Sequence, residues 1–266
     1  MTKKIAYSLL VLLLVIVAGC SKGATPAPAP AAADQSLKTV KDRGKLMVGM
    51  SGQYPPFAFR EANGELVGFD VEITTEVAKR LGVGVEYITM PFKGLVAALD
   101  SKRFDMIANQ MGITPERQAS YAFSKPYVNS GSQLLVHKDD TTINSMADVK
   151  GKKFGASQGS NYEKMLRDAG AEVVLYTSNA TLFADIAARR IDGTLNDRLQ
   201  VAYLIKQGTQ PLRAAGAPTK GVDVGLMMRK GETALISEVD KALDGMLQDG
   251  TYKKISEKWF GEDVRP

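Results

Sequence analysis

From residue 37 to the end, the chain alternates between two patterns of apolar and polar residues. Short apolar stretches predict buried strands, and longer segments with apolar residues every three or four positions predict helices. The strands are expected over residues 45–50, 85–90, 104–109, 130–138, 153–157, 171–177, 192–196 and 222–229. The helices are expected over residues 71–81, 93–101, 161–169, 180–189, 198–207, 232–248 and 252–259. This alternation predicts an α/β fold with largely parallel sheets, and leaves open whether the strands form one sheet or two.

Residues that commonly cap helices lie at several of these boundaries. We expect Asp70 to be the N-cap of the helix over residues 71–81, and Gly82 to end that helix. Thr114 and Pro115 are typical of an N-cap and a first helical position, and therefore predict another short helix.

The N-terminal residues have the pattern of an export signal. Lys3 and Lys4 precede the apolar residues 5–18, a stretch shorter than the roughly 20 residues that a membrane-spanning helix needs. It ends in Val17-Ala18-Gly19-Cys20, which resembles a bacterial lipobox, where the cysteine is lipidated and becomes the new N-terminus. The alternatives are an ordinary signal peptide with a chance cysteine, and an uncleaved anchor.

A spacer rich in alanine and proline follows the signal. Residues 25–30 alternate proline with small residues, a composition typical of an extended, semi-rigid linker. We expect a signal peptide over residues 1–19, a lipid on Cys20, and a tether over residues 20–36. The protein is then expected outside the cytoplasm, in the periplasm or at the cell surface, held to the membrane by its lipid alone.

Charge and composition exclude several classes of protein. The 34 basic and 29 acidic side chains leave a net charge of +5. Removing the signal with its two lysines leaves 32 − 29 = +3, too weak a charge to indicate nucleic-acid binding. Cys20 and His137 are the only residues of their types, which excludes an internal disulfide and Cys–His zinc sites. The chain has no P-loop and no dinucleotide-binding glycine motif, and we expect neither a metal nor a cofactor.

Residues 155–159 match the G-x-S-x-G motif of hydrolases, with Ser157 between a predicted strand and a predicted helix. A hydrolase of this type needs a histidine after the serine, whereas His137 precedes it. We therefore reject the hydrolase interpretation. The glycines and small hydroxyl side chains instead favour an anion site at a helix N-terminus.

Four further residues have two interpretations each. Arg117 could hold a carboxylate bidentately, or could be an ordinary surface arginine. Asp197 follows a predicted strand, where it could bind an ammonium group or cap the next helix. Tyr54 and Phe92 could cover a ligand, or pack in the core or in turns.

Taken together, several short runs carry a family resemblance. They are Ser51–Phe57, Gly68–Val71, Asn109–Arg117 and Phe123–Tyr127. In this order and spacing they resemble the polar amino-acid-binding proteins of ABC importers, over residues 37–265. Within that family, the runs at residues 108–110, 159–163 and 257–261 are most similar to the cystine-binding branch.

The resemblance implies a two-lobed periplasmic-binding-protein fold of type II. Lobe 1 would comprise residues 37–129 and 224–266, and lobe 2 residues 130–223. Two crossing strands, near residues 129–133 and 221–225, would join them. The ligand would lie between the lobes, which close on it.

The resemblance also implies how the backbone end of an amino acid is held. Arg117 would bind the α-carboxylate, helped by the backbone N–H of Gly112 and by Ser160 at a helix N-terminus. Asp197 would bind the α-ammonium, together with a main-chain acceptor at Gln110. Burying either ligand charge unpaired would cost several kcal/mol, so a zwitterion needs both partners.

Other positions would shape the side-chain pocket. Tyr54 and Phe92 match aromatic walls, and Asn161 and Tyr162 lie where the branch contacts the side chain. Relatives that bind cationic amino acids often carry an acid where this chain has Ser51. The sequence shows no second arginine or lysine that would select an acidic side chain. A neutral polar ligand follows, with cystine first and glutamine or a similar amino acid as the alternative.

These features predict a monomeric receptor, not an enzyme, that delivers an amino acid to an ABC permease. One alternative is a dehydratase on the same fold, for which Glu163 is the candidate general acid. Another is a sensor or adhesin that retains amino-acid binding.

Overall fold

The computed structural model describes residues 34–266. The predictions of a signal peptide, of a lipid on Cys20 and of nearly all of the tether concern residues outside this range. Within the described range, no helix is both long enough and apolar enough to span a membrane. The first described helix, α1 (Ser36–Arg43), begins at the last residue assigned to the tether and was not predicted.

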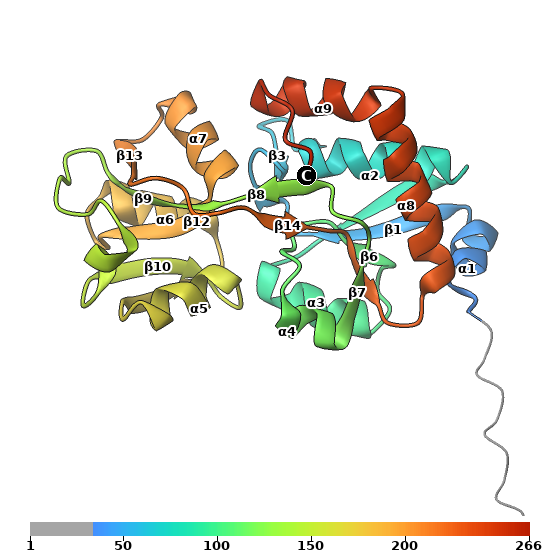
Figure 1. The fold of residues 1–266 in the computed structure, drawn as a ribbon, viewed down its shortest axis with the longest axis horizontal. Helices are drawn as coiled ribbons and strands as arrows, with labels where there is room; N and C mark the ends of the chain where they lie inside the picture. The colour runs from blue at the N-terminus through green and yellow to red at the C-terminus, as the bar shows by residue number, and fades with distance from the viewer. Residues whose placement is uncertain (1–33) are drawn as a thin grey trace, which may run out of the picture. The chain divides into compact units, whose positions relative to one another are not determined.

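The first sheet has five strands, in the order β5-β1-β6-β15-β7 (Figure 1). They are β1 (Lys45–Met50), β5 (Gly84–Thr89), β6 (Met106–Ile107), β7 (Tyr121–Phe123) and β15 (Met227–Arg229). Strand β1 is parallel to β5 and β6, and β15 runs antiparallel between β6 and β7. The helices around this sheet are α2 (Phe69–Arg80), α3 (Phe92–Asp100), α4 (Pro115–Ser120), α8 (Thr233–Gln248) and α9 (Thr251–Phe260). A small ribbon is formed by β2 (Gln53–Tyr54), β3 (Ala58–Arg60) and β4 (Leu66–Val67). We call these elements, with α1, lobe 1.

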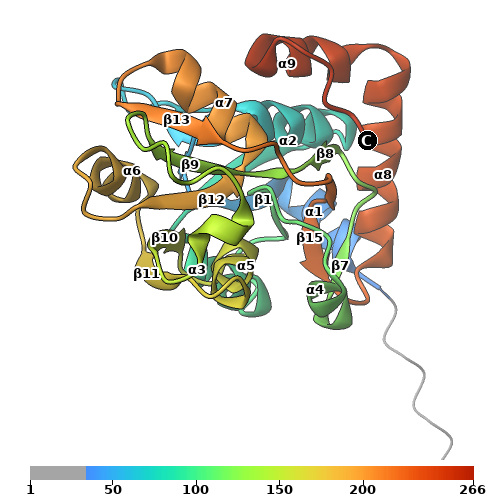
Figure 2. The same cartoon turned by 60° about the vertical axis from the view of Figure 1, so that its left-hand side comes forward.

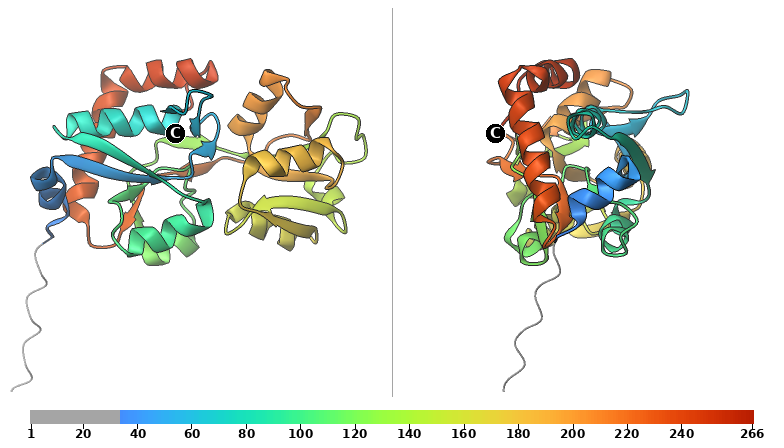
Figure 3. Two further views of the ribbon diagram at one scale, coloured as in Figure 1. Left: turned by 180° about the vertical axis from the view of Figure 1, so that it is seen from behind. Right: turned by 90° about the vertical axis from the view of Figure 1, so that its right-hand side faces the viewer.

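The second sheet also has five strands, in the order β11-β10-β12-β9-β13. They are β9 (Ser132–His137), β10 (Lys153–Ser157), β11 (Glu172–Tyr176), β12 (Gly193–Asp197) and β13 (Leu212–Ala215). Its helices are α5 (Asn161–Asp168), α6 (Asn179–Ala187) and α7 (Arg198–Gln207), with a short 3₁₀ turn, η1 (Met146–Val149). We call these elements lobe 2. Seen from behind, the two lobes are again separate groups of elements (Figure 3).

Two strands connect the lobes, β8 (Val128–Ser130) and β14 (Val222–Val224). They pair antiparallel, with Val222 opposite Ser130 and Val224 opposite Val128 (Figures 1 and 2). The strands expected over residues 130–138 and 222–229 are therefore each divided in two. The first divides at Gly131, where a Cβ atom would lie 2.1 Å from the carbonyl oxygen of Thr219.

Each lobe has its own apolar core. In lobe 1, the ring of Phe69 lies 4.9 Å from that of Phe260 and 6.1 Å from that of Tyr127, measured between centroids. In lobe 2, Phe154 and Leu166 are fully buried between the sheet and α5. Burying a side chain of this size contributes about 1.5–3 kcal/mol. The two cores are largely separate, although Leu199 of α7 in lobe 2 joins the core of lobe 1.

Gly68 explains how α2 begins. Its φ of +136° lies in a region that side chains disfavour, and a Cβ atom there would lie 2.2 Å from the carbonyl oxygen of Phe57. Gly68 is the N-cap residue, and Asp70 is the second residue of the helix. The prediction that Asp70 caps this helix is therefore wrong. Its side chain points inward, and no part of the residue is exposed.

Candidate functional site

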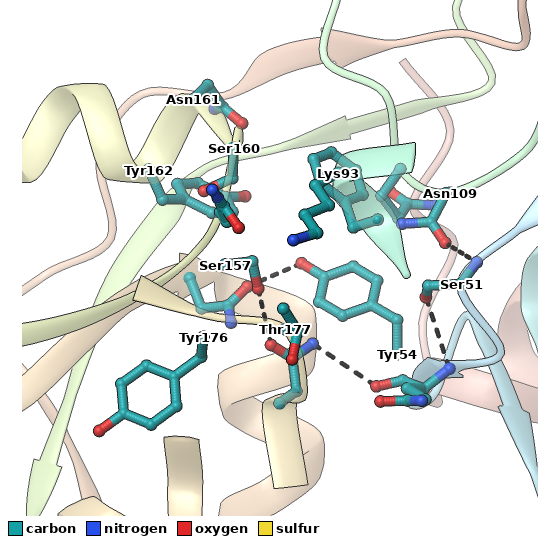
Figure 4. A pocket seen from close by; sticks show the side chains of 16 residues that line it. Ser51, Tyr54, Lys93, Asn109, Ser157, Ser160, Asn161, Tyr162, Tyr176 and Thr177 are labelled. Atoms are coloured by element: carbon teal, nitrogen blue, oxygen red, sulfur yellow. Dashed lines mark hydrogen bonds between the residues drawn. The ribbon is translucent and has the colours of Figure 1, made fainter. Parts of the chain in front are cut away.

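Two cavities meet between the lobes. The first is lined by residues of both lobes and contains about 610 Å³ of space, part of which opens to solvent (Figure 4). The second contains about 410 Å³ and reaches the crossing strands. Both cavities are lined by Gln110, Asn161 and Tyr162, so they adjoin at these residues.

The structure brings nine of the ten predicted binding residues to these cavities. Those lining the first are Ser51, Tyr54, Phe92, Gln110, Ser160, Asn161 and Tyr162. The second adds Gly112 and Asp197. Arg117 lines neither cavity, but its Nη1 donates a hydrogen bond of 3.1 Å to the carbonyl oxygen of Gly112, which does.

Arg117 is placed by the start of α4. Thr114 is the N-cap as predicted, and its hydroxyl accepts a hydrogen bond of 3.2 Å from the backbone N–H of Arg117. The guanidinium is half-buried, and burial lowers its pKa. Within residues 34–266, no carboxylate lies within 4 Å of it. A half-buried cation without a counter-ion is suited to bind an anion that comes from outside the chain.

The structure confirms one of the two interpretations of Asp197, the helix cap, and leaves the other, ammonium binding, open. Asp197 is the N-cap of α7, where its Oδ1 accepts hydrogen bonds of 2.8 Å from the Leu199 N–H and the Ser130 hydroxyl. The residue is only 2% exposed, and burial raises its pKa to about 6. Among the described residues, none with a positive charge forms an ion pair with it. The nearby cation Arg198 lowers the pKa of Asp197 but pairs with Glu262 instead. A buried carboxylate at a cavity wall that forms no ion pair suits an ammonium group.

Asp70 is a site residue that the sequence interpretation missed. Its Oδ1 accepts hydrogen bonds of 2.8 Å from the Tyr127 hydroxyl and from Nε2 of Gln110. Its Oδ2 accepts one of 3.2 Å from the backbone N–H of Gln110. Gln110 has a φ of +51°, a left-handed conformation that is uncommon for residues other than glycine. Asp70 therefore holds Gln110 at the cavity wall from both its backbone and its side chain.

Asp70 also shapes the charge of the site. Burial, with a smaller contribution from the charge of Asp197, raises its pKa to about 6. Two buried carboxylates thus lie near one space with no basic partner of their own among residues 34–266. The sequence signal available was an acid between two apolar residues, Phe69 and Val71. Only the structure shows that it lies inside the helix and not before it.

Tyr54 and Gln200 connect the lobes directly. The Tyr54 hydroxyl donates a hydrogen bond of 2.7 Å to Oδ1 of Asn196 in lobe 2. The Gln200 side chain, on α7, donates one of 3.0 Å to the carbonyl oxygen of Pro55 in lobe 1. Burial, together with neighbouring Tyr162, raises the pKa of Tyr54 well above its usual range. Tyr54 thus stays a neutral donor, and these contacts hold the lobes together around the cavities.

Lys93 is a second basic residue near the predicted binding residues, and the sequence interpretation did not identify it as one. It lines the first cavity, and among residues 34–266 it is the only charged residue that does so. Figure 4 shows its side chain extending into the space bordered by Tyr54, Ser157 and Tyr162. The sequence interpretation treated it only as the first residue of a predicted helix. Only the folded chain places its side chain opposite lobe 2.

The hydrolase-like run has a structural role. The Ser157 hydroxyl donates a hydrogen bond of 2.8 Å to Oδ1 of Asn179. Ser160 is the N-cap of α5 and accepts a hydrogen bond of 3.2 Å from the Glu163 N–H. Glu163 accepts one of 2.8 Å from the Gly159 N–H and pairs with Arg167. The carboxylate considered as a general acid is therefore occupied in a helix cap, outside the lining of both cavities.

Comparisons with known proteins agree with this geometry. The model for bacterial extracellular solute-binding proteins, family 3, matches residues 46–262. The chain is 42% identical to the L-cystine-binding protein TcyJ of Escherichia coli K12 over 86% of this chain and 87% of that protein. It is 39% identical to the L-cystine-binding protein TcyA of Bacillus subtilis 168, over 99% of both chains.

A solved structure extends the likeness to three dimensions. It is described as a putative L-cystine ABC transporter from Listeria monocytogenes, with a TM-score of 0.77 and 32% identity. It covers 84% of this chain and 98% of its own. The predicted two-lobed, type II α/β fold is thereby confirmed.

Proposed function

Because the chain belongs to the bacterial extracellular solute-binding proteins of family 3, we propose that it captures L-cystine and delivers it to an ABC permease. The observation that carries the proposal is a pair of opposite charges, Arg117 and Asp197. Each is buried or half-buried, and neither has a counter-ion among residues 34–266. A ligand that carries a carboxylate and an ammonium on one carbon supplies both.

The backbone end of the ligand is assigned to the second cavity. Arg117 and the N–H of Gly112 bind the α-carboxylate. Ser160, which lines the first cavity next to the shared residue Asn161, completes the set from lobe 2. Asp197 and the carbonyl oxygen of Gln110 bind the α-ammonium. The assignment is supported by the position of Asp197 and Gly112 in one cavity lining, with Arg117 hydrogen-bonded to Gly112.

The side chain of the ligand is assigned to the first cavity. Tyr54 and Phe92 form its aromatic walls, and Asn161, Tyr162 and Ser51 contribute the polar contacts. No carboxylate lines this cavity, which disfavours a cationic side chain such as that of arginine. Because the relatives TcyJ and TcyA are L-cystine-binding proteins, cystine is the first candidate ligand and glutamine is the alternative.

Binding is coupled to closure of the lobes. Arg117 belongs to lobe 1 and Asp197 to lobe 2, so one ligand satisfies both only when the lobes approach each other. A ligand shifts such an equilibrium by its differential contacts with the closed state. The contact between Tyr54 and Asn196 supports closure around the occupied site.

An amino-acid panel tests the proposed function. The purified protein is unfolded and refolded to remove bound ligand, and its melting temperature is measured with each amino acid. Ligand at about 100 times its dissociation constant should add roughly 2.7 kcal/mol, which raises the melting temperature by a few degrees. We expect the largest increase with L-cystine. A larger increase with glutamine would reject cystine, and no increase with any amino acid would reject the receptor function.

We also propose that the protein is a lipoprotein, with residues 1–19 removed and Cys20 lipidated. The support is the position of the only cysteine directly after Val17-Ala18-Gly19. The mass of the mature N-terminal peptide from a bacterial host tests this. A peptide that begins at Cys20 and carries lipid is expected, and an unmodified Cys20 would contradict the proposal.

A further inference from the structure

We propose that Lys93 binds the second carboxylate of the ligand, so that the first cavity is a subsite for the distal half of a disulfide-linked pair of amino acids. The inference rests on the proposed function, because it takes the first half of the ligand as bound at Asp197 and Arg117.

The shape of the space supports this division. The second cavity holds Asp197 and Gly112, and the first holds Lys93. They share Gln110, Asn161 and Tyr162. A ligand with its first zwitterion at Asp197 therefore has to pass these shared residues before its far end reaches Lys93. A small side chain would end near the shared residues, whereas a cystine extends beyond them.

The charge of the first cavity points the same way. Of its 16 lining residues, Lys93 alone is charged, which gives the lining a formal charge of +1. Within residues 34–266, Lys93 has neither an ion pair nor a side-chain hydrogen bond. Among the described residues, exposed lysines such as Lys138 and Lys206 are also unpaired, but neither of them lines this cavity. A single unpaired ammonium in the lining of a cavity favours a negatively charged ligand group there.

The neighbouring side chains can serve the distal ammonium. Gln53 and Gln158 line the same cavity, and each amide oxygen can accept hydrogen bonds. Neutral acceptors hold an ammonium without cancelling the positive charge that attracts the carboxylate. The lining thus suits a distal zwitterion whose carboxylate has the one charged partner.

Two ligands and two variants test the assignment in the full-length protein. The ligands are L-cystine and the mixed disulfide of L-cysteine with cysteamine, which keeps the disulfide and the distal ammonium but lacks the distal carboxylate. The variants are Lys93→Gln and, as a control, Lys138→Gln, an exposed lysine that lines neither cavity. Affinities are measured by titration calorimetry at low and high salt.

We expect Lys93→Gln to weaken cystine binding roughly three- to tenfold, since Lys93 is exposed and solvent screens the pair. Its affinity for the mixed disulfide should equal that of the wild type, and Lys138→Gln should change neither. Added salt should weaken cystine binding more in the wild type than in Lys93→Gln.

Unchanged cystine affinity in Lys93→Gln would overturn the inference while leaving cystine capture intact. An equal loss for both ligands would also overturn it, because Lys93 would then act on the shape of the cavity. Failure of the wild type to bind either ligand would instead reject the proposed function, and this inference with it.

Discussion

Asp197→Asn is expected to abolish amino-acid binding and, at the same time, to stabilise the unliganded protein at neutral pH. Asparagine is also a good N-cap, and its side-chain oxygen can still accept from Leu199 and Ser130. The variant therefore loses the charge and little else. Leaving a buried ligand ammonium without its partner costs about 3–5 kcal/mol, so affinity should fall by roughly 100-fold or more.

The stability effect has a definite sign. Burial raises the pKa of Asp197 from 3.8 to about 6, so the folded state binds the proton more tightly than the unfolded state. The wild type therefore gains stability as the pH falls through 6 toward 4, and loses it again as the pH rises. The pKa difference corresponds to about 3 kcal/mol of folding stability, which the wild type loses when Asp197 ionises. Asparagine cannot ionise, so Asp197→Asn keeps this stability at neutral pH. The advantage of the variant should shrink as the pH approaches 4.

Melting temperatures between pH 4 and 8, without ligand, measure this effect, and calorimetry measures binding. Asp168→Asn is a suitable control, because Asp168 is exposed and pairs with Lys164 on the surface of α5. Near-normal affinity in Asp197→Asn would show that the ammonium is bound elsewhere. A lower melting temperature at pH 7.5 would show that the charge of Asp197 stabilises the unliganded fold.

Arg117→Met is expected to reduce binding by a similar factor, roughly 100-fold or more. Methionine keeps much of the apolar stem but removes the cation that the ligand carboxylate would pair with. The fold should persist, because the Arg117 side chain makes one hydrogen bond, to Gly112, and Thr114 still caps α4. Circular dichroism checks the fold, and calorimetry measures the affinity. The affinity of Arg117→Lys should lie between those of the wild type and Arg117→Met, because lysine keeps the charge but lacks the planar guanidinium group.

An α-amide analogue separates recognition of the carboxylate from general damage. The two carboxylates of cystine are equivalent, and a mono-amide could bind with its free carboxylate at Arg117, so both are converted to amides. The diamide should bind to the wild type much more weakly than cystine does. Amidation should matter far less in Arg117→Met, where the partner of the α-carboxylate is already missing. If both proteins lose the same factor on amidation, Arg117 does not bind the α-carboxylate.

Secondary structure was predictable where local signals agreed. The helix over residues 198–207 has the predicted bounds, because Asp197 caps its start and Gly208, at a φ of +62°, ends it. The strands over residues 45–50 and 153–157 also match. The ribbon strands β2 and β4 were missed, since two-residue strands are too short to show a period. Helix α1 was missed because only Val40 in it is buried, which leaves almost no apolar stripe.

The site was predictable only in part, for a physical reason. Polar residues at strand ends and helix starts, such as Asp197 and Ser160, are visible in the sequence because their positions follow from local structure. Asp70 acts on Gln110, 40 positions further along, and no local pattern encodes that contact. The sequence shows that residue 93 is a lysine, but whether it has a counter-ion depends on which residues the fold places around it. The binding roles assigned to these residues remain predictions.

The position of β15 in the first sheet determines when lobe 1 can be completed during synthesis. Strand β15 pairs with β6 on one side and β7 on the other, yet it follows the whole of lobe 2 in the chain. The strands of lobe 2 lie within residues 132–215 and can pair while the C-terminal residues are still being made. Until residues 227–229 emerge, β6 and β7 keep unpaired edges, which are sites where chains aggregate. Lobe 2 can therefore fold early as one continuous segment, whereas lobe 1 starts first and is completed last.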